Sequence, residues 1–312
     1  MAILSAFEPI WLFAGLGYAA RRWRLLSEMA VTVLGWFVFH LAMPAALFVR
    51  LTKTPLVGFN ARPLGAFAAS TVLVIGLGWY AAGRFFDRKP GERAIWGMAA
   101  GYVNAANLGI PVAMQILGSI SFLVQALLLQ TLVVSPVILI ALDRHAETSG
   151  HAEAAGKVGF WRTATVPFHN PVIFASALGI ASSVAGFRPP PTLLTPLTWL
   201  SLTALPAAVI GLGASLYRKE PSPDARATEI SAITALKLVV QPALACAIGL
   251  LLHLPPALLL AVVVCAGLPT AQNSFVFAQR YGVGEAIASR AVLVTTTLSL
   301  ATIAAIAAML GR

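Results

Sequence analysis

Two apolar stretches of the sequence carry carboxamide and hydroxyl side chains near their centres. The first stretch contains Asn104 and Asn107, and the second contains Thr270, Gln272 and Asn273. Carboxamides donate and accept hydrogen bonds without a full charge, so they can bind a ligand inside a membrane at lower cost than an ionised group. These residues are therefore our candidates for binding a small polar or anionic substrate.

Glycine and proline accompany both polar clusters and are expected to interrupt the helices there. The residues of this kind are Gly101, Gly109 and Pro111 in the first stretch, and Gly267 and Pro269 in the second. Proline removes a backbone donor, and glycine tolerates the dihedral angles of a break. A broken helix presents an N-terminus, with roughly half a positive charge, in the middle of the membrane. Two such breaks predict a site for a carboxylate or another small anion.

Few ionisable residues fall inside the apolar stretches, and four of them have more than one interpretation. Glu8 and Arg290 lie near predicted span ends, where an interfacial residue or an orientation signal is the ordinary explanation. His40 fits a packing role better than a proton relay. Lys237 either reaches toward water, compensates a charge or contacts an anion. No aspartate lies in a predicted span, so coupling through a buried aspartate pair is not expected.

Composition indicates the kind of protein that must position these residues. The chain has 312 residues, of which 59% are hydrophobic and 10% charged, and its mean hydropathy is +0.85. Soluble domains carry roughly 25% charged residues, so a soluble globular protein is excluded. Apolar runs long enough to cross a bilayer recur along the chain, and such segments must be helical because lipid cannot satisfy the backbone. We predict an all-α polytopic membrane protein.

Ten transmembrane helices are expected, and the basic residues predict their orientation. Of the 21 lysines and arginines, fifteen fall in alternate gaps between spans or, for Arg290, at the adjoining span end. Five fall in the other gaps or at the C-terminus, and Lys237 falls well within a span. The basic gaps are therefore assigned to the cytoplasm and both termini to the outside. The net charge of +10 reflects this topology and not nucleic-acid binding. The predicted spans are residues 3–20, 30–49, 64–83, 94–117, 122–142, 166–185, 193–217, 230–252, 257–278 and 286–310.

The two halves of the chain repeat one another. A shift of 162 positions brings Pro9 onto Pro171 and Pro44 onto Pro206, and a shift of 166 brings Asn107 onto Asn273. Residues 1–142 and 166–312 are therefore predicted to be two five-helix repeats joined by a cytoplasmic linker at 143–165. An odd number of spans per repeat makes the repeat inverted, as in many secondary transporters.

The motifs resemble those of the auxin efflux carrier family, which includes the plant PIN auxin transporters and bacterial malonate and dicarboxylate carriers. The segment from Asn104 to Pro111 resembles the fourth-span crossover motif of that family, and Leu268–Pro269 with the Phe275–Ala278 run resembles its ninth-span counterpart. The resemblance extends over the whole chain. The short linker resembles the bacterial branch, so auxin is not the expected substrate.

The resemblance implies a fold like that of bile-acid sodium symporters and an elevator-type carrier. Helices 1, 2, 6 and 7 would form the scaffold and the contact of a homodimer, and helices 3–5 and 8–10 the transport domain. The crossing, broken helices 4 and 9 would hold the substrate, with Asn104 at the family's carboxylate-recognising position.

Together these features predict a secondary active transporter of a small organic anion in a bacterial cytoplasmic membrane, working by alternating access. The alternative is a ligand-gated channel or membrane sensor that binds the same anion without coupled turnover. An enzyme is not expected, because every aspartate lies in a predicted loop and no Gly-x-Ser-x-Gly occurs. No cofactor or metal site is predicted, and coupling to Na⁺ or H⁺ is left open.

Overall fold

The computed structural model describes residues 2–53, 61–148, 171–217 and 226–311. It describes the backbone but not the side chains at positions 2–8, 10, 106, 107, 110, 111, 114, 147, 148, 172, 173, 215 and 216. The described part is helical and contains no strand beyond one isolated bridge. The first half forms α1 (Ala2–Arg22), α2 (Glu28–Phe37), α3 (Met43–Thr52), α4 (Ala61–Phe85), α5 (Pro90–Gly101), α6 (Ile110–Leu117), α7 (Ser121–Leu129) and α8 (Ser135–Thr148). The second half forms α10 (Pro171–Val184), α11 (Pro191–Leu216), α12 (Ala227–Ala235), α13 (Gln241–Leu251), α14 (Pro256–Ala266), α15 (Asn273–Tyr281) and α16 (Glu285–Leu310).

Six continuous helical stretches in the described part are long and apolar enough to cross a membrane. They fall on the second, third, fifth, seventh, eighth and tenth of the predicted spans. The predicted fourth and ninth spans are each interrupted, between α5 and α6 and between α14 and α15. The stretches are Glu28–Thr52, Ala61–Phe85, Ser121–Ala146, Pro191–Ala214, Ala227–Leu251 and Glu285–Leu310.

Four short π-helices each end two residues before a proline. They are η1 (Val38–Ala42), η2 (Ala105–Gly109), η3 (Gln130–Val134) and η4 (Leu236–Val240), and the prolines are Pro44, Pro111, Pro136 and Pro242. Proline has no N–H to donate to the carbonyl four residues earlier. The helical turn before the proline is wider instead. In η1, for example, the N–H of Met43 donates to the carbonyl of Val38, five residues earlier. Such a turn changes which way the nearby side chains point.

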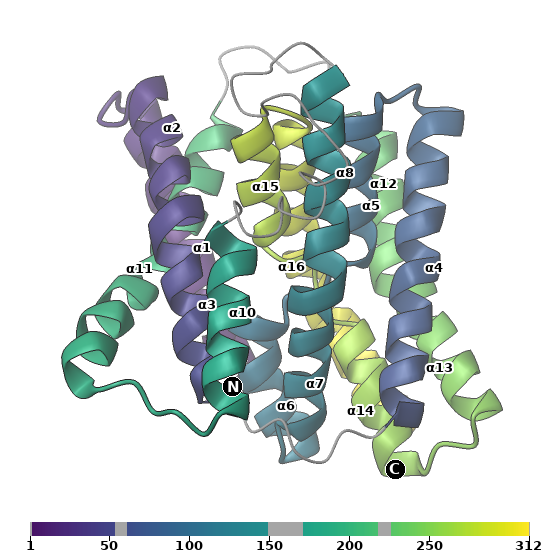
Figure 1. The fold of residues 1–312 in the computed structure, drawn as a ribbon. Coiled ribbons are helices and arrows are strands. Elements are labelled where there is room, and N and C mark those ends of the chain that lie inside the picture. The colour runs from purple at the N-terminus through teal and green to yellow at the C-terminus, as the bar shows by residue number, and fades with distance from the viewer. Residues whose placement is uncertain (1, 54–60, 149–170, 218–225, 312) are drawn as a thin grey trace.

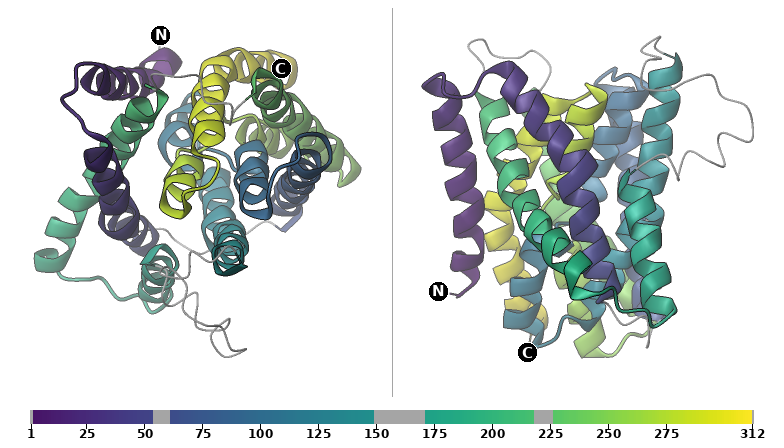
Figure 2. Two further views of the ribbon diagram at one scale, coloured as in Figure 1. Left: turned by 90° about the horizontal axis from the view of Figure 1, so that it is seen from above. Right: turned by 60° about the vertical axis from the view of Figure 1, so that its left-hand side comes forward.

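The helices pack as two groups. Helices α1, α3, α10 and α11 contact one another on one side of the molecule, while α4, α5, α12, α13 and α16 pack together on the other (Figure 1). The second group shares an apolar core that includes Trp96, Ile233 and Ile287, contributed by α5, α12 and α16. Both chain ends lie toward the same end of the bundle (Figure 2).

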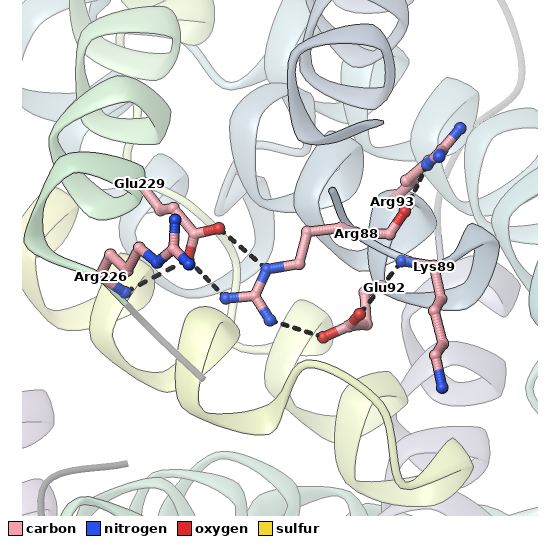
Figure 3. A network of polar contacts seen from close by, with 6 residues as sticks. All are labelled: Arg88, Lys89, Glu92, Arg93, Arg226 and Glu229. Carbon is pink, nitrogen blue, oxygen red and sulfur yellow. Dashed lines mark hydrogen bonds and ion pairs between the residues drawn. The ribbon is translucent and has the colours of Figure 1, made fainter. Parts of the chain in front are cut away.

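A half-buried arginine links the two halves of the chain within the second group. Arg88 lies in the turn between α4 and α5, and its Nε and Nη2 donate to the Glu229 carboxylate on α12 over 2.8 and 2.7 Å (Figure 3). Its Nη1 donates to Glu92 over 2.9 Å. The hydrogen bond to fully buried Glu229 raises the pKa of Arg88 above its ordinary value. A bidentate ion pair of this kind holds the two helices in a defined relative position.

Helices α1 and α11 approach so closely that glycine is required on each. A Cβ atom added to Gly213 would lie 2.0 Å from the backbone oxygen of Ala14, and one added to Gly17 would lie 2.0 Å from that of Ile210. Small residues permit this backbone contact between membrane helices. Gly15, by contrast, has nothing within 4 Å of the corresponding position.

We therefore expect opposite outcomes for two chemically identical substitutions. Gly213→Ala should lower the thermal unfolding temperature of the purified protein in detergent, because the helices must move apart. Gly15→Ala should leave that temperature unchanged or raise it, because alanine favours the helix by roughly 1 kcal/mol without a clash. Equal unfolding temperatures for the two variants would contradict this account of the contact.

Candidate substrate-binding site

The two interrupted segments lie side by side and hydrogen-bond to one another. Val103 and Thr270 form an antiparallel bridge. The N–H of Asn104 donates to the Pro269 carbonyl over 2.8 Å, and the N–H of Ala271 donates to the Tyr102 carbonyl over 3.1 Å. Each break thereby satisfies backbone groups of the other, which lipid could not do.

Gln130 on η3 completes the hydrogen bonding of the first break. Its side-chain oxygen accepts from the N–H of Val103 over 2.7 Å, and its side-chain nitrogen donates to the Val103 carbonyl over 3.1 Å. The side-chain amide therefore pairs with the Val103 N–H and C=O groups as the backbone of a neighbouring strand would. Gln130 is fully buried. Our sequence analysis missed it, although a glutamine inside an apolar run is costly enough to be a signal.

A lysine and a second glutamine lie at the C-terminal ends of α5 and α14. The Lys237 ammonium donates to the carbonyl of Ala266, the last residue of α14, over 2.9 Å and to the Gln241 side-chain oxygen. The Gln241 amide nitrogen donates to the carbonyl of Gly101, the last residue of α5, over 2.9 Å, and to Thr71.

These contacts match the electrostatics of helix ends. The C-terminus of a helix carries a partial negative charge, so a cation and an amide donor are favourable there. Lys237 and Gln241 are both fully buried. Of the alternatives open for Lys237, this geometry favours charge compensation over a side chain that reaches water. Gln241 is a second residue that our sequence analysis did not select.

A cavity of about 90 Å³ adjoins the opposite, N-terminal ends of the interrupted helices. Asn104 and Ala105 line it where η2 begins, and Gln272 and Asn273 line it where α15 begins. The remaining lining residues come from η1, α3, η3, α11 and their neighbours, and include Val38, Met43, Ala46, Leu47, Arg50, Thr131, Ser201 and Ala208. None of the described residues that line the cavity is acidic, and Arg50 is the charged one.

The predicted binding residues do not all face this cavity. Asn104, Gln272 and Asn273 line it, whereas Thr270 does not. The Thr270 hydroxyl donates to the Ala99 carbonyl over 2.6 Å, and its N–H donates to the Thr295 hydroxyl over 3.1 Å. Thr270 therefore hydrogen-bonds to α5 and α16 and stabilises the break from the side away from the cavity.

The glycines and prolines predicted to interrupt the helices lie at the ends of the half-helices. Gly101 ends α5, Gly267 follows the last residue of α14, and Pro269 supplies the carbonyl that accepts from Asn104. Gly109 ends η2, where an added Cβ would lie 2.6 Å from a Leu123 methyl carbon. The side chains of Asn107 and Pro111 lie outside the described residues.

Three of the four predicted ionisable residues, His40, Lys237 and Arg290, do not line the cavity. His40 hydrogen-bonds through Nδ1 to the Trp36 carbonyl over 2.9 Å and stacks on the Trp36 ring, which is a packing role. Arg290 lies in α16 and Lys237 on the opposite side of the breaks. The side chain of Glu8 lies outside the described residues.

Comparison with known proteins confirms the resemblance seen in the motifs. The sequence family described as membrane transport protein matches residues 2–159 and 161–307. The chain belongs to the auxin efflux carrier family. It is thus a multi-pass protein of a membrane transporter family, and the apolar stretches of the fold agree with that.

Three relatives illustrate the range of this auxin efflux carrier family. The "Putative malonate transporter" of Rhizobium meliloti is 29% identical over 302 residues, covering 92% of this chain and 89% of that protein. The "Uncharacterized transporter YfdV" of Escherichia coli (strain K12) is 27% identical over 284 residues, covering 88% and 87%. The "Probable auxin efflux carrier component 5c" of Oryza sativa is 24% identical over 367 residues, covering 99% and 97%.

The contact between Lys237 and α14 can be tested through stability. Lys237→Met should lower the free energy of unfolding by about 1–3 kcal/mol, because the Ala266 carbonyl and the Gln241 oxygen lose a buried donor. Lys53→Met, at an exposed position after α3, is the matched control and should change little. Unfolding of both variants can be measured by heating the purified proteins in detergent. A Lys237→Met protein as stable as wild type would contradict the role of Lys237 in stabilising the C-terminal end of α14.

Proposed function

We propose that this protein is a secondary active transporter of a small organic anion across the cytoplasmic membrane of a bacterium. The observation that carries the proposal is the cavity between the first residues of η2 and α15, lined by carboxamides and, among its described residues, by no acid. Two helix N-termini and three amide side chains offer donors to a carboxylate. The partial positive charges of these helix ends attract the anion.

We further propose a short dicarboxylate as substrate. The relative named as a malonate transporter supports this class. The cavity of about 90 Å³ supports it too, because pockets for drug-sized molecules run from roughly 300 to 1,000 Å³.

The architecture behind this proposal is a ten-helix bundle made of two inverted five-helix repeats, residues 1–142 and 166–312, joined by the linker 143–165. The broken fourth helix (α5, η2 and α6) and the broken ninth helix (α14 and α15) would cross at the bridge between Val103 and Thr270. The position of both chain ends at one end of the bundle supports an even number of spans (Figure 2). The distribution of basic residues supports termini outside the cell.

An elevator-type movement is proposed because the cavity lies between α3 and α11 on one side and the two interrupted segments with η3 on the other. The scaffold would comprise α1, α2, α3, α10 and α11 and would form the homodimer contact. The moving part would carry Asn104 and Asn273 past the scaffold residues Ala46 and Ser201. The scaffold and the moving part also contact each other near the end of the bundle that carries Arg21, which we assign to the cytoplasm. There the Gln279 amide donates to the Val31 carbonyl over 3.1 Å. That contact must break for the substrate to leave toward the cytoplasm.

The proposed substrate site can be tested at Asn104. Asn104→Ala should weaken carboxylate binding by more than about 1 kcal/mol, the scale of one lost buried hydrogen bond. Binding can be measured as the thermal shift of purified protein with malonate, succinate, acetate and indole-3-acetate, each with and without sodium. A ligand at 100 times its dissociation constant should add roughly 2.7 kcal/mol of stability to wild type.

Two controls make the result interpretable. Thr297→Ala, exposed on α16, should respond to ligands as wild type does. Counterflow in proteoliposomes separates a carrier from a channel or sensor, because only a carrier exchanges substrate across the membrane. Unchanged binding in Asn104→Ala would remove that residue from the site, and absence of any carboxylate response in wild type would overturn the anion proposal.

A further inference from the structure

Arg50 is a charged residue of the cavity. In the sequence it is one of the five basic residues outside the gaps assigned to the cytoplasm. It lies in the last turn of α3 and lines the same cavity as Asn104 and Asn273. It is half-buried. All other described lining residues are neutral. A single cation in a neutral cavity is a strong determinant of which ligands can enter, because attraction between charges is larger there than in water.

The helix face that carries Arg50 is the face turned toward the cavity. On α3 the lining residues are Met43, Ala46, Leu47 and Arg50, which follow the spacing of one helical face. On α11 they are Ser201, Ala204, Leu205 and Ala208, with the same spacing. The regular pattern on both helices indicates that Arg50 belongs to the wall and is not an isolated contact at its rim.

The lining residues extend along both of these helices. Met43 and Arg50 are separated by seven residues, which corresponds to a rise of about 10 Å along the helix. The long arginine side chain can shorten that separation by extending back along the wall. The cavity thus offers donors of two kinds, the helix ends with Asn104 and Asn273, and a guanidinium at a distance from them.

We propose that Arg50 is a specificity-determining residue that binds the second carboxylate of a short dicarboxylate whose first carboxylate lies at the ends of η2 and α15. The inference rests on the proposed function. A guanidinium is permanently charged and presents a planar pair of donors that matches a carboxylate. Without such a partner, burying the second carboxylate in a largely apolar cavity would be costly. A monocarboxylate forms only the first of the two interactions.

Paired ligands and paired variants test this assignment on the full-length protein in detergent. Malonate and malonamate have nearly the same size, but malonamate carries one carboxylate and one neutral amide. Wild type should bind malonate more tightly than malonamate by roughly tenfold or more, the effect expected for a hydrogen bond to a charged group. Arg50→Gln should lose most of its affinity for malonate and little for malonamate, so that the preference disappears.

Further variants separate this role from a structural one. Arg50→Lys keeps the charge but not the paired donors and should retain part of the preference. Arg62→Gln, an exposed arginine near the start of α4, is the control and should keep the wild-type preference. Dissociation constants for both ligands can be measured by calorimetry on each variant.

The outcomes distinguish the two proposals. If wild type binds no carboxylate, the proposed function fails. If wild type binds malonate and malonamate equally, the function stands and the role of Arg50 is overturned, whether or not the variants fold. Equal loss of both ligands in Arg50→Gln would likewise overturn it.

Discussion

An interrupted helix inside a membrane leaves backbone N–H and C=O groups that lipid cannot satisfy, and the centre of this protein is organised around that constraint. Two interruptions lie together, so the N–H of Asn104 donates to Pro269 and the N–H of Ala271 donates to Tyr102. Gln130 supplies both a donor and an acceptor to Val103. Neither interruption would be tolerable alone, which explains why residues far apart in sequence must fold against each other.

The two kinds of helix end at this centre have different partners, and that difference supports the proposed anion site. The C-terminal ends, with partial negative charge, receive the Lys237 ammonium and the Gln241 amide. The N-terminal ends, with partial positive charge, adjoin the cavity. The protein therefore neutralises one pole of the half-helix dipoles internally and leaves the other available to a ligand.

Proline has a second role in this arrangement besides interrupting helices. Each π-helix ends two residues before a proline, and residues of all four lie at the centre: Val38, Ala105 and Gln130 at the cavity, and Lys237 behind the breaks. A wider turn shifts the helical register locally. This shift brings a lysine and a glutamine out of otherwise apolar helices to the places where the broken backbone needs partners.

The sequence by itself determined the membrane class, the apolar spans and the interruptions, because these follow from local hydrophobicity and from the backbone chemistry of glycine and proline. It also indicated Asn104, Gln272 and Asn273, since carboxamides in an apolar run are costly. Only the tertiary structure decided which way each polar side chain faces. Thr270 turns to Ala99, while Arg50, on a different helix, turns to the cavity. The direction in which a side chain points depends on how its helix is rotated against the neighbouring helices. That rotation is set by packing between segments that are distant in sequence, so the spacing of residues along the chain does not reveal it.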